Sequence, residues 1–251
     1  PPIGGVLASP LGRSPLFLLS AALNLLLALA IVVWLRRQVP PREVDRSSEK
    51  IPLAALFTPA LIGAFILGFG ARILEGLFVG IWSIYMDDIG ASDLEIGLSY
   101  AMWSIAFLIF TPWGGRMADR GQRWRKLLPA NLVMAILMVG YGQVQWVPLI
   151  LLFGFIEGAL STITIPALDA YLASVADPRI QGRVQGTFAT IGTFGAAASA
   201  FAGTALYEYS QALPFAVAGG ALALLTILGI GFIRDRERES PLVSTSSATT
   251  G

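Results

Sequence analysis

The sequence contains neither cysteine nor histidine, and only 13% of its 251 residues are charged. The absence of cysteine excludes a disulfide scaffold, an iron–sulfur cluster and thiolate chemistry. The absence of histidine removes the most common general base and transition-metal ligand. Soluble domains carry about 25% charged residues, so this chain has too little charge to coat a soluble fold. Its 55% hydrophobic residues and mean hydropathy of +0.70 indicate a polytopic membrane protein.

Long apolar runs are what the sequence has in abundance. A helix that crosses the hydrocarbon core needs about 20 mostly apolar residues. Seven runs meet or approach this length, and a stub, Pro1–Ser9, precedes them. The predicted spans are Pro15–Trp34, Ala60–Tyr85, Ile96–Gly115, Leu127–Gln143, Trp146–Ser174, Val184–Tyr207 and Leu213–Ile233.

Basic residues separate strongly between the two alternating sets of connecting segments. One set contains 15 of the 17 lysine and arginine residues: residues 36–50, 116–126, 175–183 and 234 onward. The other set holds Arg13, together with an acidic group between Met86 and Glu95. Cytoplasmic loops are enriched in lysine and arginine. The pattern therefore predicts that the central loop and the C-terminus are cytoplasmic.

One of these basic segments, Gly115–Lys126, reads GRMADRGQRWRK and directly follows a span. It resembles the loop signature of the major facilitator superfamily, G-x-x-x-D-[R/K]-x-G-x-[R/K]-[R/K]. The residues that match are Gly115, Asp119, Arg120 and Arg123, whereas Gln122 occupies the second glycine position. A glycine here favours close helix approach, and an Asp can pair with Arg across a tight turn. The resemblance implies that this loop helps to hold one of two access states.

Two further features extend the resemblance. The opening PPIGG is similar to the end of a second signature, G-P-x-x-G-G, found in the fifth helix of proton-coupled drug antiporters, and Pro1, Gly4 and Gly5 match it. One span, a charged loop and six spans also follow the layout of the superfamily from its sixth to its twelfth helix. The resemblance implies an all-α membrane protein: a six-helix C-terminal bundle, one preceding transmembrane helix and a helix stub.

This layout divides the chain into four expected segments. The chain begins at Pro1 rather than Met, which together with the stub predicts a fragment that lacks its N-terminal half. The segments are residues 1–35, the end of the fifth helix and the sixth helix; 36–58, the cytoplasmic central loop with its lead-in to the bundle; 59–233, the six-helix bundle; and 234–251, a cytoplasmic, disordered tail.

Ionisable residues inside the spans are the candidates for a transport path, because such groups are costly in a membrane and face a cavity or a partner. Arg72 and Glu75 lie three residues apart and can pair on one helix face. Glu157, Ser161 and Thr164 form a polar stripe on another span. Glu157 is the favoured proton carrier, since no base lies near it in the sequence. Pairing that only ties helices together remains the alternative for Arg72 and Glu75.

A second polar stripe, Tyr100, Ser104 and Thr111, lies on the span that precedes the GRMADR loop. Asp169 lies near the cytoplasmic end of its span and is expected at the interface. Small residues predict close helix packing in two places: the G-x-x-x-G pair Gly76 and Gly80, and the run Gly192–Gly203.

The function that the resemblance implies is secondary transport of a small organic solute by alternating access, coupled to protons and directed outward. We expect no enzymatic activity, metal or cofactor, and no nucleic-acid partner. The expected partners are the solute, protons, the lipid bilayer and the N-terminal half, in the plasma (inner) membrane. A seven-span receptor or sensor without transport is the alternative. A retinal protein is excluded, because both lysines, Lys50 and Lys126, lie in loops and not in a span.

Overall fold

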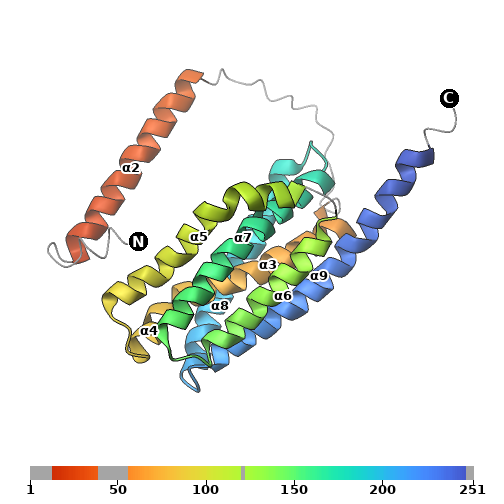
Figure 1. The fold of residues 1–251 in the computed structure, drawn as a ribbon. Helices are drawn as coiled ribbons and strands as arrows, with labels where there is room; N and C mark the ends of the chain where they lie inside the picture. Colours follow the sequence, from red (N-terminus) through yellow and green to blue (C-terminus); the bar gives the residue numbers. More distant parts are fainter. Residues whose placement is uncertain (1–12, 39–55, 120–121, 247–251) are drawn as a thin grey trace. The chain divides into compact units, whose positions relative to one another are not determined.

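The computed structural model describes residues 13–38, 56–119 and 122–246, and every regular element among them is helical (Figure 1). The chain divides into two units, Pro1–Pro52 and Leu53–Gly251. The first contains α2 (Arg13–Gln38), which covers the expected span Pro15–Trp34. The stub Pro1–Ser9 and residues 39–55 of the central loop lie outside the described residues.

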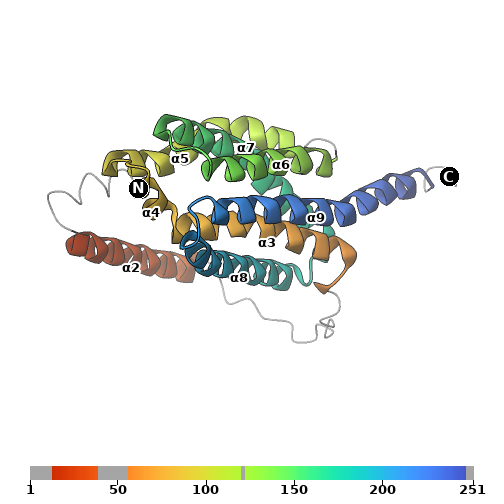
Figure 2. The same cartoon turned by 90° about the horizontal axis from the view of Figure 1, so that it is seen from below.

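The second unit is a bundle built around six long helices. Figure 2 shows α5, α6 and α7 in one layer and α3, α8 and α9 in the other. The closest pairs are α5 with α7, α3 with α8 and α9, and α6 with α9. The helices are α3 (Pro59–Gly80), the short α4 (Trp82–Asp88), α5 (Asp93–Asp119), α6 (Trp124–Tyr141), α7 (Val147–Val175), α8 (Gln181–Tyr207) and α9 (Leu213–Ser246).

Five described helices, α3, α5, α7, α8 and α9, are long and apolar enough to cross a membrane. The sixth, α6, has 18 residues and corresponds to the span expected to be the shortest. Many large apolar side chains point outward from the bundle, where water would penalise them and lipid would not. Those on the long helices that are at least 70% exposed are Val79, Leu108, Ile136, Phe194 and Phe201. The composition and the fold together define an all-α membrane protein.

The helix that begins at Pro59 starts as its sequence predicts but ends earlier. Thr58 is the N-cap, and its hydroxyl accepts a hydrogen bond from the Leu61 N–H at 3.3 Å, while proline occupies the first turn. The expected span ran to Tyr85 without interruption. The helix instead breaks at Ile81, whose φ of −127° is not helical, and resumes as α4. The chain changes direction at this break, and α4 then packs against α5.

Glycine brings α3 and α8 into backbone contact, as the G-x-x-x-G pattern predicts. A Cβ atom at Gly76 would overlap the backbone of Ala196, and one at Gly80 would lie 3.0 Å from the backbone of Ala200. From the α8 side, Gly195 receives the ring of Phe69. Both predicted small-residue segments therefore serve the same helix interface.

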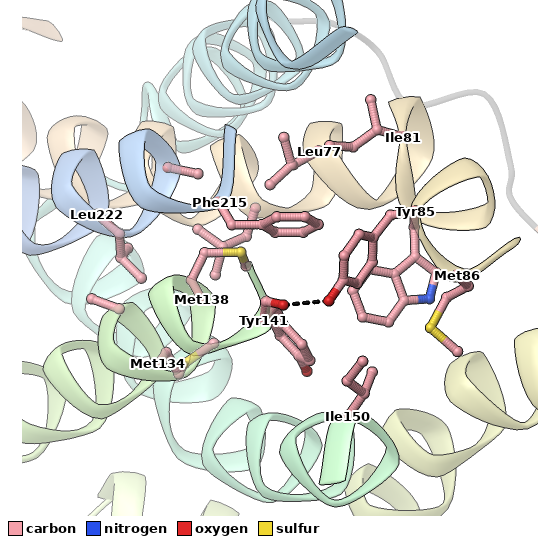
Figure 3. Close-up of a cluster of buried hydrophobic side chains, with 14 of the residues drawn as sticks. Leu77, Ile81, Tyr85, Met86, Met134, Met138, Tyr141, Ile150, Phe215 and Leu222 are labelled. Carbon is pink, nitrogen blue, oxygen red and sulfur yellow. Dashed lines mark hydrogen bonds between the residues drawn. The ribbon is translucent and has the colours of Figure 1, made fainter. Parts of the chain in front are cut away.

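The main core lies at the end of the bundle that contains α4, which we call the α4 end. It joins α3, α4, α6, α7 and α9 through buried aliphatic and aromatic side chains (Figure 3). The Tyr85 hydroxyl lies 2.7 Å from the carbonyl oxygen of Val144 and also contacts that of Tyr141, so it satisfies carbonyl groups at the end of α6. The Trp82 indole N–H donates to Ser99 Oγ at 2.8 Å and ties α4 to α5.

The opposite end of the bundle carries the basic turns. Between α7 and α8, the Arg179 guanidinium donates to Asp177, with Nη2 and Oδ2 2.8 Å apart. These hydrogen bonds lower the pKa of the Asp177 carboxyl below its usual value. The pair closes a short turn between two spans.

The C-terminal segment differs from expectation. Residues 234–251 were expected to form a cytoplasmic, disordered tail. In the structure α9 continues to Ser246, and residues 247–251 lie outside the described residues. The run RDRERE places opposite charges three residues apart, as in Arg234 with Glu237 and Asp235 with Arg238. Such spacing supports a helix beyond the membrane, which composition alone did not reveal.

Candidate functional site

Glu157 lies inside the bundle on α7 and is 5% exposed. The Tyr141 hydroxyl at the end of α6 donates a hydrogen bond to Glu157 Oε2 at 3.1 Å. Gly158, the next residue, packs against the backbone of Trp103 and holds α7 close to α5. A carboxyl group in such a place is expensive unless it is hydrogen-bonded or protonated. The site can therefore hold a proton.

The rest of the predicted stripe is also buried, since Ser161 is 3% and Thr164 8% exposed. The Ser161 hydroxyl donates to the backbone carbonyl of Glu157 at 2.8 Å, so it serves its own helix and not the carboxylate. The stripe lines one face of α7, as the spacing predicted.

Arg72 and Glu75 occupy a different environment. They form the predicted ion pair on α3, and their side chains are 48% and 53% exposed. The stem of Arg72 packs beside Gly192 of α8, and Arg72 also interacts electrostatically with Asp169, an exposed residue of α7. The structure thus brings Arg72, Glu75 and Asp169 to an exposed face and leaves Glu157 in the interior.

The second stripe lies along α5, and its first residue, Tyr100, contacts α3 and α4. The Tyr100 hydroxyl lies 3.4 Å from both Ser83 Oγ and the Phe78 carbonyl oxygen. Ser104 and Thr111 are exposed, and each donates to a carbonyl one turn earlier in α5. Tyr100 therefore links α5 to the end of α3 and the start of α4, while Ser104 and Thr111 leave an exposed polar track.

The close helix approach expected at Gly115 occurs instead at its neighbour. A Cβ atom at Gly115 would meet nothing within 4 Å among the described residues, whereas one at Gly114 would overlap Thr162 of α7. Gly114 is the residue of the pair that faces α7, because adjacent helical residues point about 100° apart. Among the described residues, Gly114 and not Gly115 makes the close contact with α7.

Two of the remaining loop residues, Asp119 and Arg123, lie at the end of the bundle opposite α4. Asp119 is the last residue of α5, and Arg120 falls outside the described residues. Arg123 Nη1 donates to Ser174 Oγ of α7 at 3.2 Å. Lys126 donates to the Met117 carbonyl and joins the start of α6 to the end of α5. The basic loop thus connects α5, α6 and α7.

Sequence reasoning missed Tyr141, the partner of the Glu157 carboxylate. It lies near the end of the predicted span Leu127–Gln143, where the sequence pattern singled out no site residue. A lone aromatic residue beside glycine carries no signal for such a contact.

In the described part of the chain no group of three or more acidic, histidine or cysteine residues could hold a metal ion.

Comparison with known proteins places this membrane protein in a family. The Major Facilitator Superfamily profile matches residues 60–250, so the chain belongs to this superfamily of transporters, whose members move small molecules and are generally not enzymes. The match confirms the family that the sequence resembled and is consistent with a C-terminal half.

Three relatives illustrate the likeness. The chain is 28% identical over 192 residues to "Multidrug resistance protein MdtG" of Enterobacter lignolyticus, covering 73% of this chain and 46% of that protein. It is 31% identical over 183 residues to "Multi-drug resistance efflux pump PmrA homolog" of Lactococcus lactis, covering 69% and 43%. It is 22% identical over 172 residues to "Quinolone resistance protein NorA" of Staphylococcus aureus, covering 66% and 42%. The chain spans about half the length of these relatives.

Proposed function

We propose that this chain is the C-terminal half of a proton-coupled exporter of small organic molecules that works by alternating access. The observation that carries the proposal is the buried Glu157 carboxyl group, which has a tyrosine hydroxyl as its partner and, among the described residues, no ion-pair partner. A transporter that uses protons needs a carboxylate or histidine that can change its charge inside the membrane, and this chain has no histidine. The efflux and multidrug names of the relatives support the outward direction and the substrate class.

The proposed path combines the exposed polar faces of α3 and α5 with the buried polar stripe of α7. Arg72 and Glu75, with Tyr100 and Ser104, contribute polar groups on exposed faces where a solute can bind. Glu157, followed by Ser161 and Thr164, holds the proton. In this assignment the solute and the proton bind at separate places in one bundle. The helices between these places couple solute binding to proton binding.

The loop at the end of the bundle opposite α4 completes the proposal. Gly115, Asp119, Arg120 and Arg123 bias the balance between access states, and the basic loops place this end and the C-terminus in the cytoplasm. Residues 1–35 supply the sixth helix and the end of the fifth, residues 36–58 the central loop, and residues 59–233 the C-terminal bundle. An N-terminal half of the same protein closes the path, in the inner membrane.

The test uses the complete protein that carries this chain, reconstituted into liposomes with an imposed proton gradient. Norfloxacin, a fluorescent quinolone, and ethidium, a planar cation, serve as probes. Wild-type protein should move at least one of them with the gradient, and Glu157→Gln should reduce this movement to background while leaving expression unchanged. The matched control is Glu208→Gln, which changes an exposed glutamate directly after the end of α8 and should behave as wild type.

Normal gradient-driven movement in Glu157→Gln would refute the role of this carboxylate. If wild-type protein moves neither probe, the proposed substrate class is wrong.

A further inference from the structure

We propose that Tyr141 is a positioning residue that holds the Glu157 carboxyl group and links it to α4. This inference rests on the proposed role of Glu157 as the proton carrier. The hydroxyl of Tyr141 lies 3.1 Å from Glu157 Oε2, and the tyrosine side chain is fully buried. A hydroxyl can donate to either protonation state of a carboxyl group, because both states keep an accepting oxygen. Tyr141 can therefore hold Glu157 throughout a proton cycle.

Tyr141 is itself held by rings from four helices. Its ring makes edge-on contacts with Phe78 of α3, Trp82 of α4 and Phe153 of α7, at centroid distances of 5.9, 4.9 and 5.6 Å. Phe215 of α9 lies against it at 6.3 Å. Edge-to-face pairs are favourable and directional, and a close-packed core leaves a ring little room to swing. The hydroxyl is thereby aimed at one place.

The backbone of Tyr141 has a second attachment. The Tyr85 hydroxyl of α4 donates to the Tyr141 carbonyl, as the dashed line in Figure 3 shows. The same hydroxyl lies 2.7 Å from the Val144 carbonyl. A displacement of α4 would thus act on both the ring and the backbone of Tyr141. A change in the position of α4 would therefore change the position of the Glu157 carboxyl group through Tyr141.

The other polar side chains of the proposed path have partners of their own. Ser161 donates to the backbone of Glu157 rather than to its carboxylate. Arg72 and Glu75 on α3 pair with each other on an exposed face. The stretch of α5 between Tyr100 and Arg116 contains no ionisable residue. Among the described residues, Tyr141 is the side chain that hydrogen-bonds this carboxyl group.

Infrared difference spectroscopy on the complete, reconstituted protein tests the inference without a known substrate. A change of pH should give a band from the C=O stretch of a protonated carboxyl group, and Glu157→Gln should abolish it. Because a hydrogen bond to the carbonyl oxygen weakens the C=O bond, Tyr141→Phe should move the band to higher wavenumber. Tyr85→Phe should produce a smaller shift. The matched control is Tyr209→Phe, which removes a hydroxyl from a side chain that is 84% exposed and should leave the band unchanged.

Replacement of Tyr141 by 3-fluorotyrosine supplies a second variant that preserves the ring. The fluorinated phenol is a stronger donor and should move the band to lower wavenumber, the opposite direction to Tyr141→Phe. A band that Glu157→Gln removes but that neither change at Tyr141 moves would overturn the positioning role and leave the proton carrier intact. A spectrum that Glu157→Gln does not alter would overturn both.

Discussion

The backbone of Gly76 on α3 lies directly against the carbonyl group of Ala196 on α8, so closely that a Cβ atom has no space there. Contacts of this kind replace the hydrophobic effect as a source of helix association in lipid, because lipid tails are as apolar as the side chains. The α3–α8 pair carries both Arg72 and the glycine beside its stem. The packing of these helices therefore sets the face on which the ion pair lies.

Gly76→Ala should destabilise the protein by about 1–3 kcal/mol, because an atom added against a backbone forces the helices apart. Unfolding by denaturant in detergent micelles measures this change. The matched control is Gly97→Ala on α5, where a new Cβ would meet nothing within 4 Å and the protein should keep its stability. Equal stability of the two variants would show that the close approach contributes nothing.

Ser99→Ala should cost about 1–3 kcal/mol, since it leaves the Trp82 indole N–H buried without an acceptor. The same unfolding measurement applies. Ser104→Ala, on the same helix, removes an exposed hydroxyl that bonds its own helix and should change stability by less than about 0.5 kcal/mol. If Ser99→Ala is as mild as Ser104→Ala, the bond does not hold α4 to α5.

Glu75→Gln should reduce gradient-driven probe movement by about tenfold or more, the effect of losing one charge-assisted contact. The double variant Arg72→Glu with Glu75→Arg restores a pair of charges but exchanges their positions. If the pair serves the transport path, the double variant should stay impaired while expressing normally. Full recovery of flux would instead support a purely structural pair.

Asp119→Asn should shift the balance of access states by about fivefold or more, in line with typical coupling energies of 1–3 kcal/mol. Single cysteines introduced on the exposed face of α3 can report accessibility, since the chain has no native cysteine. Asp177→Asn is the matched control at the same end of the bundle, where Asp177 pairs with Arg179 in a turn. Unchanged labelling in Asp119→Asn would remove Asp119 from the gating role.

Much of the fold could be predicted because long apolar runs and glycine spacing are local properties of the chain. A close helix approach at Gly76 and Gly80 followed from their spacing, although the partner helix did not, and the pairing of Arg72 with Glu75 followed from a spacing of three residues. The break at Ile81 was not predicted, because Gly80, the residue before it, was interpreted only as a packing residue of the G-x-x-x-G pair. The helix after Ile233 was missed because composition was weighed above charge spacing.

By itself, the sequence determined that this protein lies in a membrane, where its helices run, and which ionisable residues enter the spans, because hydrophobic length and charge placement act through solvation. Only the tertiary structure decided the environment of each such residue. It placed Arg72 and Glu75 on an exposed face, buried Glu157 beside Tyr141, and chose Gly114 over Gly115 for the contact with α7. These outcomes depend on which helix faces which neighbour, a relation between distant segments that a local pattern does not contain.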